Sequence, residues 1–179
     1  MSIQVFILSK LMIGKTYPYE LKKQMSEPIP LDELGGITES KLYYHFDALA
    51  KRGFIEPVEI IKEEHRPDKQ VFAITAKGSE ELPKKIYKIF ESANDINDIV
   101  IGLANIKYVD SEKVVILLKG RLDDYKDHWD RIMNFENNTP RDKKSENLNE
   151  LLLGYFTTKS DHTIYWIEEA IKQIEQGNI

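Results

Sequence analysis

Cysteine is absent from the 179 residues of this chain. Its absence excludes disulfide bridges, thiolate nucleophiles and zinc sites with cysteine ligands. Catalysis would have to use histidine, carboxylate or hydroxyl groups, yet the sequence has no phosphate-binding glycine loop, Ser-His-Asp set or paired-carboxylate site with supporting context. We therefore expect a protein that is not an enzyme and needs no cofactor.

Metal ligands of other kinds are too few. Asp124 and His128 stand four residues apart, a spacing that metal sites on helices use. A site needs a third and a fourth ligand, and none can be placed beside this pair. The sequence therefore predicts no metal site, and both residues are expected on the surface.

Long hydrophobic runs are missing as well. No apolar stretch approaches the roughly 18 to 20 residues that a membrane-spanning helix needs. The first residues also lack the charged, then apolar, then small pattern of a secretory signal. We therefore expect a cytoplasmic protein without a membrane partner.

The chain also has no excess of basic over acidic residues. The formal net charge is −5, which argues at first against nucleic-acid binding, because that requires clustered lysine and arginine. Residues 1–85 nevertheless hold 13 basic and 13 acidic residues, whereas the remainder holds 12 and 17. Two functional regions are the natural interpretation. The neutral first part can bind DNA if its basic side chains share one face, although a strongly basic domain would make a better electrostatic case.

The most informative segment is residues 38–55, which has the pattern of an amphipathic helix ended by Gly53. Thr38 is a good N-cap, because its hydroxyl can accept a hydrogen bond from a free backbone N–H. At about 100° per residue, Leu42, Phe46 and Leu49 share one stripe. The opposite face carries Ser40, Lys41, Tyr44, Ala48 and Lys51. This second face would meet a DNA groove, although periodicity alone fits a solvated surface equally well.

The segments around this helix complete a recognisable order. Apolar spacing predicts a helix over residues 3–13, and Pro18 opens a second one that runs to about Met25. Residues 54–61 and 71–74 read as two strands of a hairpin with a charged tip. Three helices followed by a hairpin form the winged variant of the helix-turn-helix arrangement. A further helix begins at about Ala76, with Thr75 as its cap.

The second half of the chain is helical. A short helix is expected from Asp95, and a longer one after Asp110 has apolar residues at alternating spacings of four and three. The stripe of the longer helix is Val114, Leu118, Leu122, Tyr125, Trp129 and Ile132. The last helix repeats this rhythm less regularly with Leu148, Leu152, Tyr155, His162, Trp166 and Ala170. The two long helices are expected to form an antiparallel helical hairpin.

We therefore predict a mainly α fold with a small β-hairpin. Residues 1–92 form a winged helix-turn-helix DNA-binding domain, and residues 93–179 form a helical dimerisation domain. The aromatic residues of the long helices are expected to serve packing and dimer contacts rather than a ligand box, although a cavity between subunits stays open as an alternative. The predicted dimer interface consists of Val114, Leu118, Leu122, Tyr125, Trp129, Leu152, Tyr155 and Trp166.

Several of these residues occur in an order and spacing typical of one family. In the first half they are Ile7-Leu8 with Gly14, Tyr19-Glu20-Leu21, Leu42-Tyr43 with Phe46, Leu49, Gly53 and Ile55, and Ile74-Thr75 with Gly78 and Leu82. Near the end, Tyr165-Trp166-Ile167-Glu168-Glu169-Ala170 forms a tryptophan-centred stretch. Over nearly its whole length the chain resembles the PadR-like transcriptional regulators, specifically those with the extended helical C-terminal region called virulence activator alpha.

This resemblance implies a homodimeric repressor that binds an inverted-repeat operator in double-stranded DNA. It also implies release by a small aromatic or drug-like effector, as in some members. The chain departs from the family at Lys41 and Tyr44, where a small hydroxyl residue and proline are more common, and at Phe46, where leucine is usual. These changes lie on or near the groove face, so the operator sequence does not carry over.

The predicted DNA contacts combine the helix face with the hairpin tip. They are Thr38, Ser40, Lys41, Tyr44, His45, Lys51, Arg66 and Lys69. His45 lies at the edge of the apolar stripe, where packing is slightly favoured over a phosphate contact. Arg66 and Lys69 would bind backbone phosphates without reading bases. The alternative function is a winged-helix protein-interaction module without sequence-specific DNA binding, which the acidic net charge supports.

Overall fold

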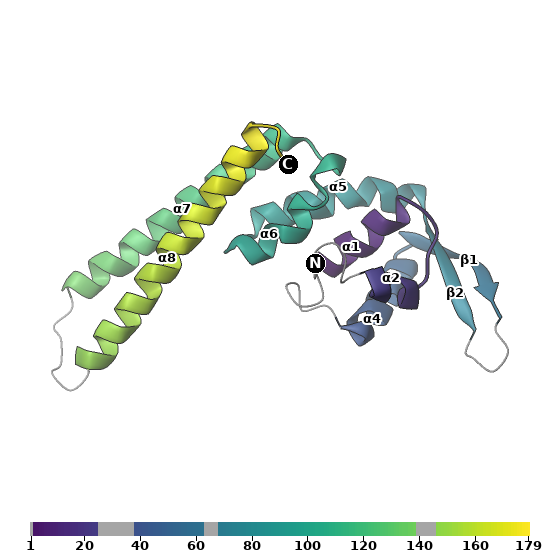
Figure 1. Cartoon of the computed structure of the whole chain (residues 1–179), viewed down its shortest axis with the longest axis horizontal. Helices are drawn as coiled ribbons and strands as arrows, with labels where there is room; N and C mark the ends of the chain where they lie inside the picture. Colours follow the sequence, from purple (N-terminus) through teal and green to yellow (C-terminus); the bar gives the residue numbers. More distant parts are fainter. Residues whose placement is uncertain (1, 25–37, 63–67, 139–145) are drawn as a thin grey trace. The chain divides into compact units, whose positions relative to one another are not determined.

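The computed structural model describes residues 2–24, 38–62, 68–138 and 146–179 (Figure 1). The elements in chain order are α1 (Ser2–Leu11), α2 (Pro18–Gln24), α4 (Glu39–Lys51), β1 (Ile55–Ile61), β2 (Lys69–Ile74), α5 (Ala76–Glu91), α6 (Ile96–Leu103), the 3-10 helix η1 (Ile106–Tyr108), α7 (Ser111–Asn138) and α8 (Glu146–Glu175). The predicted fold class, mainly helical with one β-hairpin, is confirmed. None of the helices in the described residues is long and apolar enough to span a bilayer.

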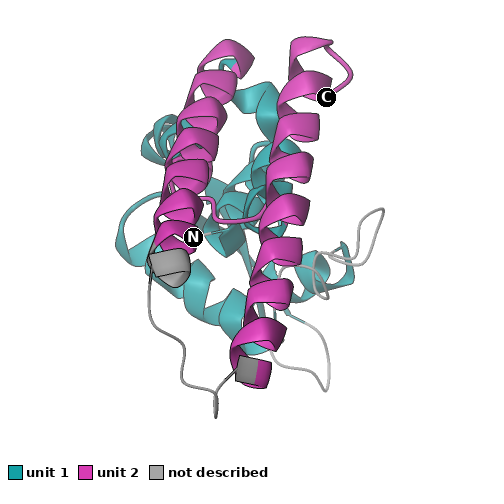
Figure 2. Cartoon of the chain, turned by 90° about the vertical axis from the view of Figure 1, so that its left-hand side faces the viewer, with its two compact units in different colours: residues 1–89, 97–110 teal, residues 90–96, 111–179 magenta. Residues whose placement is uncertain are grey.

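The chain divides into two compact units, coloured separately in Figure 2. The N-terminal unit comprises residues 1–89 and 97–110, and the C-terminal unit comprises residues 90–96 and 111–179. Most of α6 and all of η1 therefore belong to the N-terminal unit, although they follow residue 92 in the chain. The division into functional domains at residue 92 stays a prediction.

Helix α4 has a defined beginning and end. The hydroxyl of Thr38, the N-cap, accepts a hydrogen bond from the backbone N–H of Lys41 at 3.4 Å. At the other end, the N–H of Gly53 donates to the carbonyl of Ala50 and the N–H of Phe54 to that of Leu49. This pair of bonds is a Schellman motif, and Gly53 has the positive φ of 70° that the motif requires. Both predicted helix signals are confirmed.

The hairpin is tied to the helical part of its unit. Strands β1 and β2 pair antiparallel from Ile55 opposite Ile74 to Ile61 opposite Lys69. Thr16, between α1 and α2, forms an isolated bridge with Phe72 through two backbone hydrogen bonds of 3.1 and 2.8 Å. The bridge gives the base of β2 a second backbone partner, so the strand is held on both sides.

The start of α5 is bonded to the end of α4. The N–H of Gly78 donates to the Thr75 hydroxyl at 3.1 Å, which confirms Thr75 as the cap of α5. The same hydroxyl donates to the carbonyl of Gly53 at 2.8 Å. A Cβ placed on Gly78 would lie 2.0 Å from the carbonyl oxygen of Phe54. The backbone of Phe54, in the turn after α4, thus comes so close to α5 that only glycine fits at position 78.

In the C-terminal unit, α7 and α8 lie side by side as the predicted helical hairpin (Figures 1 and 2). The ion pairs Lys119–Glu175 and Lys126–Glu168, each 2.7 Å, join the two helices. As residue numbers rise on α7 they fall on α8, so these pairs set an antiparallel register.

Within the single chain, most of the apolar stripe predicted for α8 is exposed. Ala170 is buried as expected, but Leu148, Leu152, Tyr155 and Trp166 are between 42% and 59% exposed, and His162 is exposed as well. The buried residues of α8 are Ser160, Thr163, Ile167, Ala170, Ile171 and Ile174. Their row is displaced by about a quarter turn from the aromatic one. The buried row combines three isoleucines with the small side chains of Ser160, Thr163 and Ala170, which occupy less space between packed helices than aromatic rings would.

Candidate nucleic-acid interface

Helix α4 presents its polar face to solvent, as the sequence predicts. Leu42, Phe46 and Leu49 are at most 1% exposed and fix the rotation of the helix. Ser40, Lys41 and Lys51 are exposed on the opposite side, and the side chain of Tyr44 is 68% exposed. Burial of a tyrosine usually stabilises a protein, so a tyrosine left this open is available to a partner.

Thr38 is exposed at the N-terminal end of this face. Its hydroxyl already accepts a hydrogen bond from within the helix, but it can still donate one. A role in DNA binding is therefore compatible with its role as the cap, and it stays a prediction.

His45 is half-buried at the edge of α4. The side-chain amide nitrogen of Gln4, on α1, lies 3.4 Å from His45 Nδ1, and the Tyr44 ring meets the imidazole edge to face at 5.2 Å. Burial, reinforced by positive charge that includes Lys41, lowers the pKa of His45 below its ordinary value of 6.5. An amide donor at Nδ1 fits the neutral imidazole that this shift favours. A phosphate contact by His45 stays a prediction.

The hairpin supplies only part of the predicted set. Arg66 lies outside the described residues. Lys69 begins β2, is half-buried, and places its ammonium 5.5 Å from the centre of the Tyr17 ring. Its aliphatic chain thus lies along the protein while its charge stays near the surface.

The structure also gathers basic residues that the sequence analysis missed. A cleft of about 420 Å³ in the N-terminal unit is lined by Gln4, His45, Arg52, Glu81, Lys84, Lys85 and Lys88. Lys85 is 8% exposed and pairs with Glu81 at 3.6 Å, while Lys84 and Lys88 are exposed. The cleft adds positive charge along one side of α4. No sequence signal marks it, because its residues come from three separate helices and the turn after α4.

The predicted dimer residues fall into three groups. Val114, Leu118 and Leu122 are at most 7% exposed in the single chain, so they pack within the chain, and a role in a dimer stays a prediction. Tyr125 and Trp129 are half-buried. The remaining three, on α8, are exposed: Leu152, Tyr155 and Trp166.

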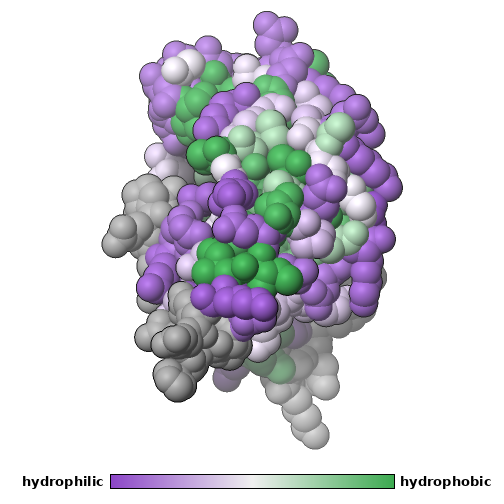
Figure 3. Space-filling model, turned by 90° about the vertical axis from the view of Figure 1, so that its right-hand side faces the viewer, coloured by the Kyte–Doolittle hydropathy of each residue, from purple (hydrophilic) through white to green (hydrophobic). Residues whose placement is uncertain are grey.

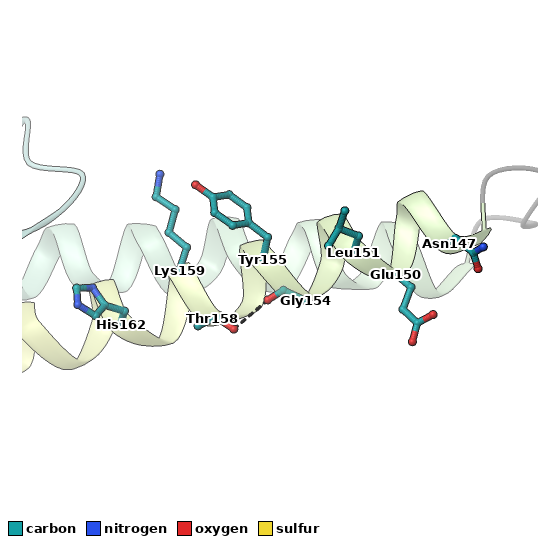
Figure 4. Close-up of a pocket in the computed structure, with 8 residues that line it drawn as sticks. All are labelled: Asn147, Glu150, Leu151, Gly154, Tyr155, Thr158, Lys159 and His162. Atoms are coloured by element: carbon teal, nitrogen blue, oxygen red, sulfur yellow. Dashed lines mark hydrogen bonds between the residues drawn. The ribbon is translucent and has the colours of Figure 1, made fainter.

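The exposed face of α8 is continuous and largely apolar. Leu151, Tyr155 and Phe156 are between 47% and 69% exposed. Leu151 and Tyr155 line a shallow groove with Gly154 and His162, and Figure 4 shows that the Leu151, Tyr155 and Lys159 side chains extend to the same side of the helix. The hydroxyl of Thr158 donates to the carbonyl of Gly154 at 3.0 Å, so it is already partnered within the helix.

The chain was compared with protein families, curated proteins and solved structures. No model of a protein family matches the chain, and a search of curated proteins returns no match. Among solved structures, a transcriptional regulator from Clostridium thermocellum is 32% identical, with 48% of this chain and 78% of that chain covered and a TM-score of 0.40. A PadR family transcription regulator from Clostridium difficile R20291 is 20% identical, covering 49% and 86%, with a TM-score of 0.40.

A third solved structure extends over nearly the whole chain. Bacillus subtilis PadR in complex with operator DNA is 18% identical, covering 97% of this chain and 99% of that chain, with a TM-score of 0.42. The solved structures that resemble this chain thus include PadR-like transcriptional regulators, the family that the sequence resembles.

Proposed function

We propose that this PadR-like chain is a homodimeric transcription regulator that binds double-stranded DNA. The observation that carries the proposal is the polar face of α4, with Ser40, Tyr44 and Lys51 open to solvent. The helix stands directly before a β-hairpin in the same unit, which is the order of a winged helix-turn-helix. In that arrangement the face enters the major groove and the hairpin contacts the backbone.

The dimer is proposed to form through the exposed face of α8. Leu152, Tyr155 and Trp166 leave apolar area in water that a second copy can cover. Two copies related by a two-fold axis present two identical α4 helices, which is why the target would be an inverted repeat. Both helices reach successive major grooves when they stand about 34 to 36 Å apart or a multiple of that distance.

Repression follows if the dimer occupies an operator. An aromatic or drug-like effector would release the DNA by binding better to a dimer in which the two α4 helices stand at another separation, because a ligand shifts an equilibrium only by its difference in affinity for the two states. The aromatic composition of the exposed α8 face supports such a ligand.

The test begins with selection of fragments from a genomic library by the purified protein, followed by gel-shift titration at several salt concentrations. Lys51→Ala should weaken binding to all sequences alike and lower the slope of log affinity against log salt by about one, because one phosphate contact is lost. Tyr44→Ala or Ser40→Ala should instead change the preferred sequence. Lys172→Ala, an exposed lysine on α8, is the matched control and should change neither quantity.

The alternative is a protein-interaction module, favoured by the net charge of −5. If the intact dimer retains no duplex fragment at low salt, the regulator proposal fails and a winged-helix docking module takes its place. If Lys51→Ala and Lys172→Ala lower the salt slope equally, the proposed DNA face is misplaced.

A further inference from the structure

A second site lies inside the N-terminal unit, between the start of α2, helix α4 and strand β2. It is a cavity of about 560 Å³. Aromatic rings make up much of its lining: Tyr17, Tyr19, Tyr43, Phe46 and Phe72. This volume falls within the range of small-molecule sites, which combine an apolar and aromatic lining with a few polar groups.

The floor of this aromatic cavity is preformed. Phe46 and Phe72 are 1% and 5% exposed, and their ring centres lie 5.2 Å apart with an interplanar angle of 53°. The backbone bridge from Thr16 to Phe72 fixes the chain directly before Tyr17 against strand β2. A ligand would therefore meet packed rings and would not have to order them, which saves binding free energy.

The mouth of the cavity has two half-exposed tyrosine rings. Tyr19 and Tyr43 line it, yet they are 42% and 46% exposed. Figure 3 views the molecule from the side on which the β-hairpin lies in Figure 1, and it shows apolar patches bordered by hydrophilic surface. When a flat apolar group covers such half-exposed rings, their burial contributes favourable binding free energy.

Charge decides which ligand fits. The carboxylates of Asp47 and Asp68 are both exposed and line the same cavity. The ammonium of Lys69 lines the cavity too, so its three charged groups leave a net negative lining, which favours a cation over a phosphate or a carboxylate. The Tyr17 face already holds the ammonium of Lys69 at 5.5 Å, which shows that the ring accepts a cation.

We propose that this cavity binds a small aromatic molecule that carries a positively charged amine. The ring of the ligand lies among the tyrosines, and its ammonium group pairs with Asp47 and Asp68. Only the regulatory consequence rests on the proposed DNA-binding function. Tyr43 and Asp47 flank Tyr44 on α4, and Lys69 is a predicted DNA contact, so an occupied cavity would compete with the operator.

Direct binding is tested without DNA, using fluorescence anisotropy of 1-naphthylmethylammonium. Uncharged 1-naphthylmethanol and anionic 1-naphthylacetate are the matched probes. The ammonium probe should saturate the protein and bind at least about tenfold more tightly than the anion, since a factor of ten corresponds to about 1.4 kcal/mol. The double variant Asp47→Asn with Asp68→Asn should lose about tenfold in affinity for the ammonium, and Tyr43→Ser should also weaken it.

The control is Asp123→Asn with Asp127→Asn, two exposed carboxylates on α7, which should bind the ammonium like the unchanged protein. Circular dichroism verifies that each variant is folded. No saturable binding, equal affinity for the three probes, or unchanged affinity in the Asp47/Asp68 variant would overturn the proposal. Gel shifts without any ligand measure DNA binding separately, so the cavity can fail while the regulator stands, and the reverse.

Discussion

At the residue scale, the lack of a Cβ at Gly78 allows α5 to pack directly against the backbone of Phe54. A Cβ at this position would meet the carbonyl group of Phe54, part of the backbone, which cannot move aside as a flexible side chain could. The sequence marked Gly78 only as part of a family pattern. Its spatial reason involves a residue 24 positions earlier, and such a contact is invisible to a local reading.

We expect Gly78→Ala to destabilise the protein by about 3 kcal/mol, the upper end of common point-mutation effects, because the new Cβ overlaps a backbone carbonyl. Chemical denaturation followed by circular dichroism measures the change. Gly120→Ala on α7 is the control: its added Cβ meets nothing within 4 Å, so it should be neutral or stabilising by up to about 1 kcal/mol. Equal midpoints for Gly78→Ala and the unchanged protein would contradict the close contact.

His45 predicts a pH dependence of stability. Its pKa is lowered in the folded state from the ordinary 6.5, so the unfolded chain binds more protons when the pH falls below that value. The stabilisation associated with neutral His45 is complete above pH 6.5 and is lost as the pH falls through 6.5 toward the lower pKa of the folded state.

The test measures denaturation midpoints of the unchanged protein and of His45→Gln between about pH 8 and pH 5. This interval extends about one and a half pH units on each side of the ordinary histidine pKa. The variant should lose less stability over that interval than the unchanged protein. All other titratable groups are common to the two proteins, so the difference between the two profiles isolates the imidazole. Parallel profiles would rule out a shifted His45.

At the scale of elements, the sequence was informative wherever the cause of an element is local. Thr38 and Gly53 delimit α4 through hydrogen bonds within a few residues, and Thr75 starts α5 in the same way. The identity of the buried face of α8, by contrast, does not have a local cause. Two apolar stripes compete on that helix, and which one is buried depends on packing against residues distant in the sequence, which periodicity does not reveal.

The exposed stripe of α8 makes a prediction about assembly. Tyr155→Ser combined with Trp166→Ser should weaken the dimer at least about a hundredfold, because burial of one large apolar side chain contributes roughly 1.5 to 3 kcal/mol. Sedimentation equilibrium of the full chain measures the dissociation constant. Asp161→Ser, exposed on another side of α8, should leave that constant unchanged. A dimer that tolerates the double variant would place the interface elsewhere.

At the scale of the whole molecule, the order of the elements was predictable, but contacts between distant segments were not. The pairing of Gln4 with His45 joins residues 41 positions apart, and the basic cleft assembles from residues 4 to 88. The aromatic cavity was missed for the same reason. Its rings come from α4, β2, α2 and the residue before α2, and no sequence pattern indicates that these segments meet around one cavity.

The proposed two-fold arrangement predicts a strict dependence on operator spacing. About five base pairs inserted between the half-sites place the second site on the opposite side of the duplex, so binding should fall to that of a single half-site. Inserting about ten base pairs restores the facing and should recover more affinity than five. Gel-shift titration of the three duplexes decides this, and indifference to the insertion would argue against paired recognition.

The Thr75 hydroxyl, which bonds both to the start of α5 and to the carbonyl of Gly53, has a mechanical consequence. Together with the close contact at Gly78, it joins the end of α4 to the start of α5, so α4 cannot turn by itself without breaking these contacts. A rotation of the first turns of α5 would therefore be passed on to α4. If α4 binds DNA as proposed, its face could be reoriented without local unfolding of either helix.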